Sequence, residues 1–96
     1  MKVTGWTNGR GTYGIRVGKN DAREHFDRTW ASVVIEVAGV SEEYPLAATF
    51  WTTCPEFRGR TIGAWLVREG FAPWPAQQSP ELDLVSVGER RFRLAR

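Results

Sequence analysis

The chain contains one cysteine and one histidine, and these two shortages limit the chemistry that it can carry. A single cysteine, Cys54, rules out an internal disulfide and a cysteine-based zinc site. With His25 as the only histidine, the two-histidine metal motifs are also ruled out. We therefore expect no metal and no cofactor, and a fold that depends on packing alone.

Long hydrophobic runs are missing too. No window approaches the roughly 18 consecutive apolar residues that a membrane-spanning helix needs. The first residues, Met1–Trp6, lack the apolar segment of a signal peptide. We therefore expect a cytoplasmic protein without a membrane partner.

The remaining composition is typical of one soluble domain. The 96 residues are 42% hydrophobic and 25% charged, and we expect a single domain over residues 1–96. The net charge is only +2, yet eleven of the thirteen basic residues are Arg, whose planar fork matches phosphate and guanine. A coding bias toward Arg would explain this number.

The basic residues also cluster along the chain, in three groups: Arg10, Arg16, Lys19 and Arg23; Arg58 and Arg60; and Arg90, Arg91, Arg93 and Arg96. The acidic residues lie chiefly elsewhere, at Glu42, Glu43, Glu81 and Asp83. Such a separation of sign can become a basic face after folding.

Alternating apolar residues and turn signals predict a small sheet. The predicted strands are Thr4–Thr7 and Arg10–Val17 around an Asn8-Gly9 turn, then Trp30–Val37, then Tyr44–Phe50 after a turn over Gly39–Glu43, and finally Leu82–Val87 and Arg91–Leu94. These segments would enclose the apolar residues on one side.

Two short helices complete the predicted fold. The first would be capped by Asn20 or Asp21 and would place Phe26 in the core. A loose turn would start at Thr53, and a firmer helix would run over Thr61–Glu69 and end at Gly70. We expect an α+β fold, a small barrel-like mixed sheet of five to seven short strands with two short helices.

Two stretches share a pattern with a known family. The first is Val17-Gly18-Lys19 followed by Ala22 and Phe26, and the second contains Trp65, Gly70 and Phe71. In this order, they resemble the B3-type DNA-binding pseudobarrel. The chain departs from that family at Gly18, where proline is usual, and at Pro73-Trp74-Pro75, where a Gly-Asp pair is usual.

The resemblance implies that the chain binds double-stranded DNA in the major groove through two arms. The first arm would carry Arg10, Thr12, Arg16, Lys19, Asn20 and Arg23. The second arm would carry Thr52, Thr53, Arg58 and Arg60. The basic members would contact phosphate, and Asn20 would read adenine if it does not serve as a helix cap. The same residues also fit ordinary solvated faces.

The sequence also suggests two alternatives to DNA binding, a protein-interaction module and an enzyme. Trp74 among Pro73, Pro75 and Pro80 would suit a protein-interaction module, with a protein partner bound at an exposed Trp/Pro loop. His25 and Cys54 are the candidates for an enzyme, but no triad is visible around them, so we expect no catalysis. The spacing Gly9-x-Gly11-x-x-Gly14 precedes a predicted strand instead of a helix, which excludes a dinucleotide fingerprint.

Overall fold

The computed structural model describes residues 1–53 and 55–96, and these form one coiled sheet with three short helices. The strands are β1 (Lys2–Thr7), β2 (Tyr13–Val17), β3 (Ser32–Val37), β4 (Val40–Pro45), β5 (Glu56–Arg58), β6 (Glu81–Gly88) and β7 (Arg91–Ala95). The helices are α1 (Lys19–His25), α2 (Ala48–Thr52) and α3 (Arg60–Arg68).

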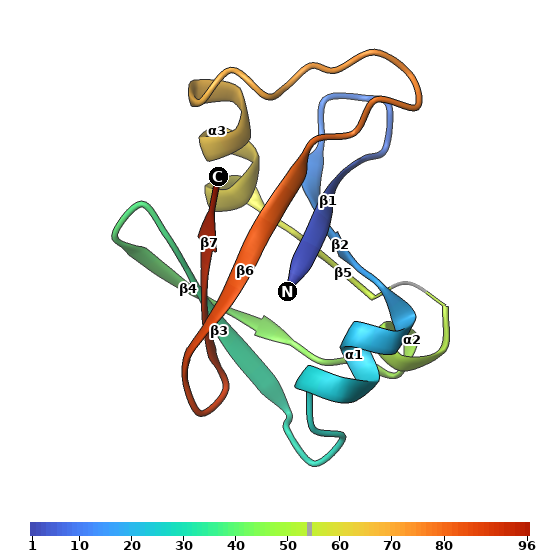
Figure 1. Ribbon diagram of the computed structural model, residues 1–96, viewed down its shortest axis with the longest axis vertical. Coiled ribbons are helices and arrows are strands. Elements are labelled where there is room, and N and C mark those ends of the chain that lie inside the picture. The colour runs from blue at the N-terminus through green and yellow to red at the C-terminus, as the bar shows by residue number, and fades with distance from the viewer. Residues whose placement is uncertain (54) are drawn as a thin grey trace.

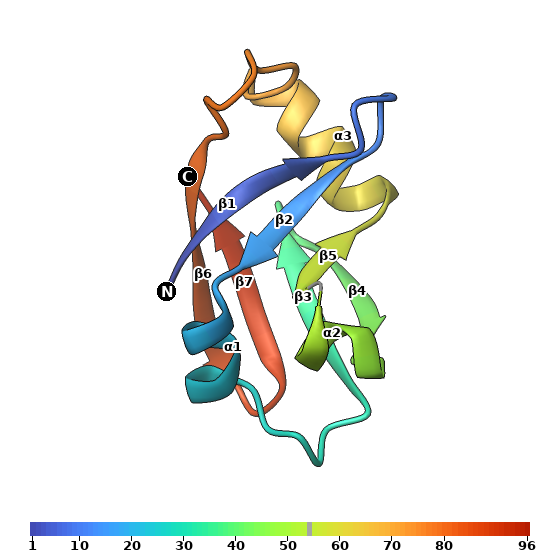
Figure 2. The same cartoon turned by 90° about the vertical axis from the view of Figure 1, so that its right-hand side faces the viewer.

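The seven strands follow the order β4-β3-β7-β6-β1-β2-β5. β3 and β7 are parallel, and the other neighbouring pairs are antiparallel. The sheet coils until its two edge strands approach each other, as Figures 1 and 2 show. The rings of Tyr44 on β4 and Phe57 on β5 lie 5.6 Å apart. The predicted α+β fold with a small barrel-like mixed sheet is therefore confirmed.

Alternation along the strands fills the inside of this barrel. Val33, Ile35 and Val37 are buried on β3, as predicted, while Phe92 and Leu94 are buried on β7. Phe26 joins them from the end of α1, and its ring stacks on Phe92 at 4.8 Å. An aromatic side chain buried in this way contributes about 1.5–3 kcal/mol of hydrophobic free energy.

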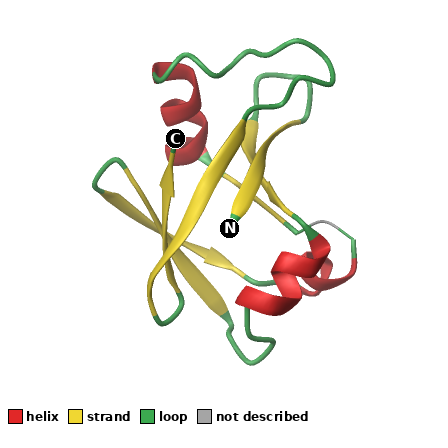
Figure 3. Ribbon diagram, in the orientation of Figure 1, coloured by secondary structure: helices red, strands yellow, loops and turns green. Residues whose placement is uncertain are grey.

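The helices lie at opposite ends of the barrel. α1 and α2 are neighbours at one end, and α3 covers the other (Figures 1 and 3). α3 buries Ile62, Trp65 and Leu66, and Gly70 after it adopts a φ of 82°. This helix agrees closely with the predicted Thr61–Glu69. Within the described residues, no helix is long and apolar enough to cross a membrane.

The segment between β3 and β5 differs from the prediction. The turn is Ala38-Gly39, with φ values of 49° and 83°, and β4 therefore begins at Val40. Alanine rarely adopts a positive φ, so the sequence did not mark this turn. The predicted strand Tyr44–Phe50 is correct only at Tyr44 and Pro45, which end β4. From Ala48 it is wrong, because Ala48–Thr52 forms the helix α2, which was not predicted.

Two predicted helix starts are also wrong. α1 begins at Lys19 with Gly18 as its N-cap, so neither Asn20 nor Asp21 caps it. Thr53 ends α2 instead of starting a helical turn, and Glu56 begins β5. The backbone N–H of Thr53 donates to the carbonyl of Thr49 at 3.0 Å. In both places, capping residues occur without the cap that they usually make.

The two end strands of the chain share one neighbour. β6 lies between β1 and β7, and its residue Asp83 is in register with Lys2 on one side and with Ala95 on the other. The Lys2 ammonium also pairs with the Asp83 carboxylate at 3.0 Å. The first and last strands are thus fixed to the same point of the sheet.

Candidate nucleic-acid interface

The eight residues predicted to contact DNA are all exposed. They lie on the β1–β2 loop (Arg10, Thr12), on β2 (Arg16), on α1 (Lys19, Asn20, Arg23), on β5 (Arg58) and at the start of α3 (Arg60). Since β2 pairs with β5 and leads directly into α1, these elements form one side of the barrel, which faces the viewer in Figure 2.

The β1–β2 loop is ordered by the side chain of Asn8. Its Oδ1 accepts the backbone N–H groups of Arg10 at 2.7 Å and of Thr12 at 3.2 Å. Gly9 and Gly11 adopt φ values of 77° and 89°. The predicted hairpin is confirmed, but its loop spans residues 8–12 and is longer than a two-residue turn. The longer loop carries Arg10 and Thr12 beyond the sheet.

An open cleft of about 540 Å³ separates this loop from α3. We call it the loop cleft, and it is lined by Gly11, Thr12, Tyr13, Arg58, Gly59, Arg60, Gly63, Ala64 and Val67. Thr12 thus lines the same cleft as Arg58 and Arg60, although more than forty residues separate it from them in the sequence. None of its described lining residues is acidic, but the Glu42 carboxylate lies beside Gly59, where it would be 3.1 Å from an added Cβ. The loop cleft therefore carries two arginines with one carboxylate at its border.

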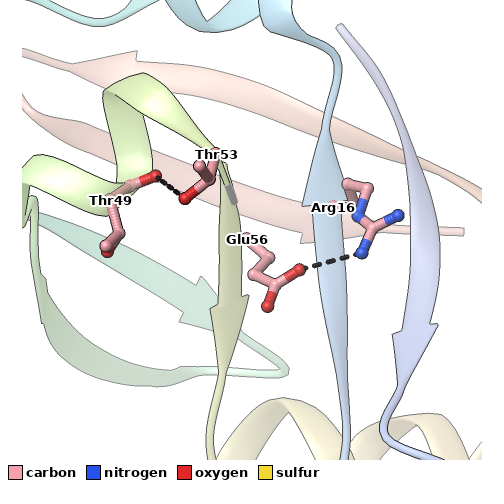
Figure 4. A network of polar contacts seen from close by, with 4 residues as sticks. All are labelled: Arg16, Thr49, Thr53 and Glu56. Atoms are coloured by element: carbon pink, nitrogen blue, oxygen red, sulfur yellow. Dashed lines mark hydrogen bonds and ion pairs between the residues drawn. The ribbon is translucent and has the colours of Figure 1, made fainter.

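The outer face of β2 and β5 connects the loop cleft to α1. Arg58 lies opposite Gly14, and its guanidinium carbon stands 5.2 Å from the ring centroid of Trp6. Arg16 lies opposite Glu56, and its guanidinium donates to that carboxylate at 3.1 Å (Figure 4). Arg16 is therefore neutralised in part by a neighbour, whereas Arg58 is held by an aromatic ring.

Gly14 makes this connection possible. A Cβ atom at Gly14 would lie 2.3 Å from the carbonyl oxygen of Phe57 and 2.8 Å from the Cα of Arg58. Both are backbone atoms of β5, so neither could move aside without disturbing the strand. β2 and β5 thus approach each other in a way that only glycine allows at this position.

Three neighbouring clefts that share lining residues follow Arg16 along α1 toward Trp51 of α2, and we call them together the helix groove. The first, of about 360 Å³, is bordered by Arg16 and Lys19. The second, of about 240 Å³, shares Lys19 with the first and adds Arg23 and Arg28. The third, of about 620 Å³, shares Arg23, Arg28 and Trp51 with the second. Cations therefore border the groove along its length.

Arg28 and Trp51 belong to this groove but were not among the predicted site residues. The guanidinium carbon of Arg28 lies 4.9 Å from the centroid of the Trp51 ring. Trp51 is carried by α2, whereas the sequence pattern predicts a strand for Tyr44–Phe50 just before it. A sequence signal for this helix would have placed Trp51 beside α1, but α2 has only five residues and gives no such signal.

Asn20 plays a local role on α1. Its Oδ1 accepts a hydrogen bond from the Arg23 guanidinium at 3.3 Å, and the Arg23 Nε donates to the Lys19 carbonyl at 3.5 Å. The amide oxygen is thus engaged, which leaves it less suited to reading a base. Asn20 helps to orient Arg23 along the helix groove.

The second predicted arm is divided. Arg58 and Arg60 join the loop cleft, whereas Thr52 borders the helix groove. The Thr52 hydroxyl donates to the Ala48 carbonyl at 3.1 Å, and the Thr53 hydroxyl donates to the Thr49 carbonyl at 3.5 Å (Figure 4). These hydroxyls therefore bond to their own helix.

Acidic groups on and after α1 accompany the cations. Asp21, Glu24 and His25 offer ligand atoms that lie within 4.8 Å of one another, but three exposed or half-exposed groups on one helix are common without a metal, and we assign none. The Thr29 hydroxyl and then the Thr29 backbone N–H lower the pKa of Asp27. Asp27 therefore stays charged at the mouth of the groove.

The C-terminal arginines lie away from this side, since β7 is separated from β2 by β6 and β1. Arg93 pairs with Glu36 at 2.7 Å, and Arg96 pairs with Glu69 at 2.7 Å. The third basic cluster of the sequence is therefore partly neutralised and does not extend the site.

Trp74, His25 and Cys54 are the candidate residues for a protein-interaction module or an enzyme. Trp74 is half-buried, its ring centroid is 5.3 Å from that of Tyr13, and a Cβ at Gly5 would touch it. His25 is exposed, and its nearest charged group is Asp21, with Nε2 3.8 Å from the carboxylate oxygen. Cys54 lies outside the described residues.

A polar seam joins β4 to the start of α3. The Thr61 hydroxyl donates to the Glu42 carboxylate, and the Tyr44 ring packs beside Gly59. The Tyr44 hydroxyl is buried and makes no hydrogen bond with a described group. Burial raises its pKa above the ordinary value, and the nearby Glu42 charge raises it further.

Comparisons with protein-family models, with curated proteins and with solved structures return no match for this chain. The resemblance to B3-type domains therefore stays a prediction from the sequence. What the protein binds has to be inferred from its own residues.

Proposed function

We propose that the protein binds double-stranded DNA, without catalysis, through the basic side that joins the loop cleft to the helix groove. The observation that carries the proposal is that all eight predicted residues are exposed and lie on adjoining elements. Arginine and lysine side chains on such a surface would contact successive phosphates and release counterions.

The dimensions of the molecule support this proposal. Its longest extent is 35 Å, which equals the length of about ten base pairs at about 3.4 Å each. Phosphate contacts would orient the protein, and Arg58 or Arg60 at the loop cleft would read guanine edges. Basic residues at both ends of the long side would thereby fix the position of the protein along the duplex.

The proposal is tested by fluorescence anisotropy with a labelled random-sequence duplex at about 50 and about 200 mM salt. We expect the affinity to fall about a hundredfold or more between these salts, because several phosphates are neutralised. Arg16→Ala and Arg23→Ala should each weaken binding to all sequences alike and make the salt dependence shallower. Arg91→Ala on β7 is the matched control and should bind as the wild type does.

Two results would overturn the proposal: no binding at the lower salt, or variants at Arg16 and Arg23 that bind as tightly as the control. The alternative function, a protein-interaction module at Trp74, predicts instead a partner whose binding barely responds to salt. The packing of Trp74 on Tyr13 makes this loop less available, so DNA binding is favoured.

A further inference from the structure

The helix groove contains a feature that duplex binding does not use. Trp51 is half-exposed there, and its back is supported by the buried Phe50, whose ring meets it edge-on at 5.0 Å and 83°. The Arg28 guanidinium covers the ring at 4.9 Å. A supported indole beside open space is a stacking surface for another flat group.

The cover over this ring is easily displaced. Arg28 is exposed, and in the described part of the chain it forms neither an ion pair nor a hydrogen bond. Its contact with Trp51 is an exposed cation–π interaction, which is a weak one. A base that stacks on Trp51 could take the place of the guanidinium, and Arg28 would then be free to contact phosphate.

Phosphate-binding groups stand next to the ring. Lys19, Arg23 and Arg28 border the same cleft as Trp51, which has a volume of about 240 Å³. The adjoining cleft of about 620 Å³ falls within the size range of small-molecule sites, roughly 300–1,000 Å³, and is lined by Glu24 and Asp27 as well as by Arg23 and Arg28. Aromatic rings interleaved with cations are how proteins hold single-stranded nucleic acid. A base paired inside a duplex exposes only its edges, whereas an unpaired base can turn its whole face to Trp51.

We propose that the helix groove binds an unpaired nucleotide of DNA, with its base stacked on Trp51 and the adjacent phosphates held by Lys19, Arg23 and Arg28. This inference rests on the proposed DNA binding and adds a substrate preference to it: the protein favours duplex that carries a single-stranded end or a displaced base. The loop cleft holds the paired part.

The experiment compares two labelled probes with equal numbers of phosphates, a blunt duplex and a shorter duplex with a single-stranded thymidine tail. The wild type should bind the tailed probe more tightly, by between about fivefold and about a hundredfold, the range for stacking one base on an aromatic ring. Trp51→Ala should abolish this preference while keeping the blunt-duplex affinity. Arg58→Ala, the matched control, should weaken both probes by the same factor.

A second measurement does not depend on the alanine variant folding. The tail should quench tryptophan fluorescence in the wild type, and Trp51→Phe should lose most of that quenching while melting at the wild-type temperature. Equal affinity of the wild type for the two probes would overturn the inference, as would equal losses for both probes in Trp51→Ala. If the protein binds the tailed probe but not the blunt duplex, the proposal of duplex binding is wrong and the proposal for the helix groove stands. If it binds neither probe, both proposals are wrong.

Discussion

The loop cleft and the helix groove both gather cations, yet their surroundings differ. In the loop cleft, Arg58 and Arg60 have no carboxylate among the described lining residues, and Arg58 is held by the Trp6 ring. In the helix groove, Arg16 is paired with Glu56, and Asp27 stands at the mouth. Among the described residues neither Arg58 nor Arg60 forms an ion pair, although Glu42 lies close to Gly59, whereas a phosphate beside Arg16 would compete with a carboxylate that is already paired.

The number of cations therefore does not by itself define a binding surface. We expect the loop cleft to supply most of the electrostatic affinity and the helix groove to supply selectivity, through Trp51. The two regions are joined by the close contact of β2 with β5, so each can be perturbed separately or both at once.

The largest effect is expected from Gly14→Ala, which breaks the joint between the two regions. The added Cβ would overlap backbone atoms of Phe57 and Arg58, so unfolding should become easier by about 3 kcal/mol. Gly18→Ala is the control, because a Cβ there would lie 3.7 Å from its nearest neighbour, and it should cost no more than about 1 kcal/mol, the loss of glycine as the N-cap of α1. Chemical denaturation of both variants measures this. Equal free energies of unfolding for Gly14→Ala and Gly18→Ala would show that β2 and β5 can move apart at Gly14 without cost.

The next prediction compares how much duplex affinity is lost when two arginines are removed from the loop cleft or from the helix groove. Arg58→Ala combined with Arg60→Ala should weaken duplex binding at about 50 mM salt by roughly tenfold to a hundredfold, about 1.4–2.7 kcal/mol. It should also make the logarithmic salt dependence shallower by about two. Arg16→Ala combined with Arg23→Ala should lose less, because Arg16 is already paired. Titration at several salts measures both, and equal losses would contradict the division of roles.

A smaller effect concerns Tyr44, in the polar seam between β4 and the start of α3. The pKa of Tyr44 is raised in the folded protein, so the unfolded chain releases this proton first as the pH rises. Stability should be unaffected near neutral pH and should fall above about pH 10, by at most about 1.4 kcal/mol for each further pH unit. Tyr44→Phe should reduce that decline and change little at neutral pH, which denaturation at pH 7 and pH 11 would reveal. An unchanged alkaline decline would assign it to other groups.

The smallest expected effect concerns the ion pair between Arg16 and Glu56. Glu56→Gln would release Arg16 and remove a negative charge from the DNA-facing surface, so duplex affinity should rise by about two- to fivefold. Folding stability should change by less than about 1 kcal/mol, because Arg16 is exposed. Unchanged or weaker binding would place Arg16 outside the interface. Anisotropy and thermal melting, carried out together, separate the two quantities.

Most of the fold was predictable because its strands alternate and α3 carries strong start and stop signals. Val33, Ile35 and Val37 marked β3, and Gly70 with Pro73 marked the end of α3. The failures lie where local signals conflict with packing. Ala38 adopts a positive φ that alanine normally avoids, and α2 has only five residues, too few for a periodic pattern.

The candidate site was only partly predictable for a related reason. The sequence marks cations, but it does not mark which of them have acidic neighbours. Glu56 meets Arg16 only because β5 pairs with β2, forty residues away along the chain. Trp51 meets Arg28 only because an unpredicted helix brings them together. Such pairings depend on topology, which one chain does not reveal through its local patterns.

The position of Asp83 between Lys2 and Ala95 has a consequence for engineering. Two strand spacings of about 4.8 Å place the start of β1 and the end of β7 about 10 Å apart. A short glycine linker could therefore close the chain into a ring, and new termini could be opened in the turn at Ala38-Gly39. In such a permutant the order of synthesis would change while the basic side stayed intact, so a reporter or an effector domain could be attached at the new termini, away from the proposed DNA-binding side.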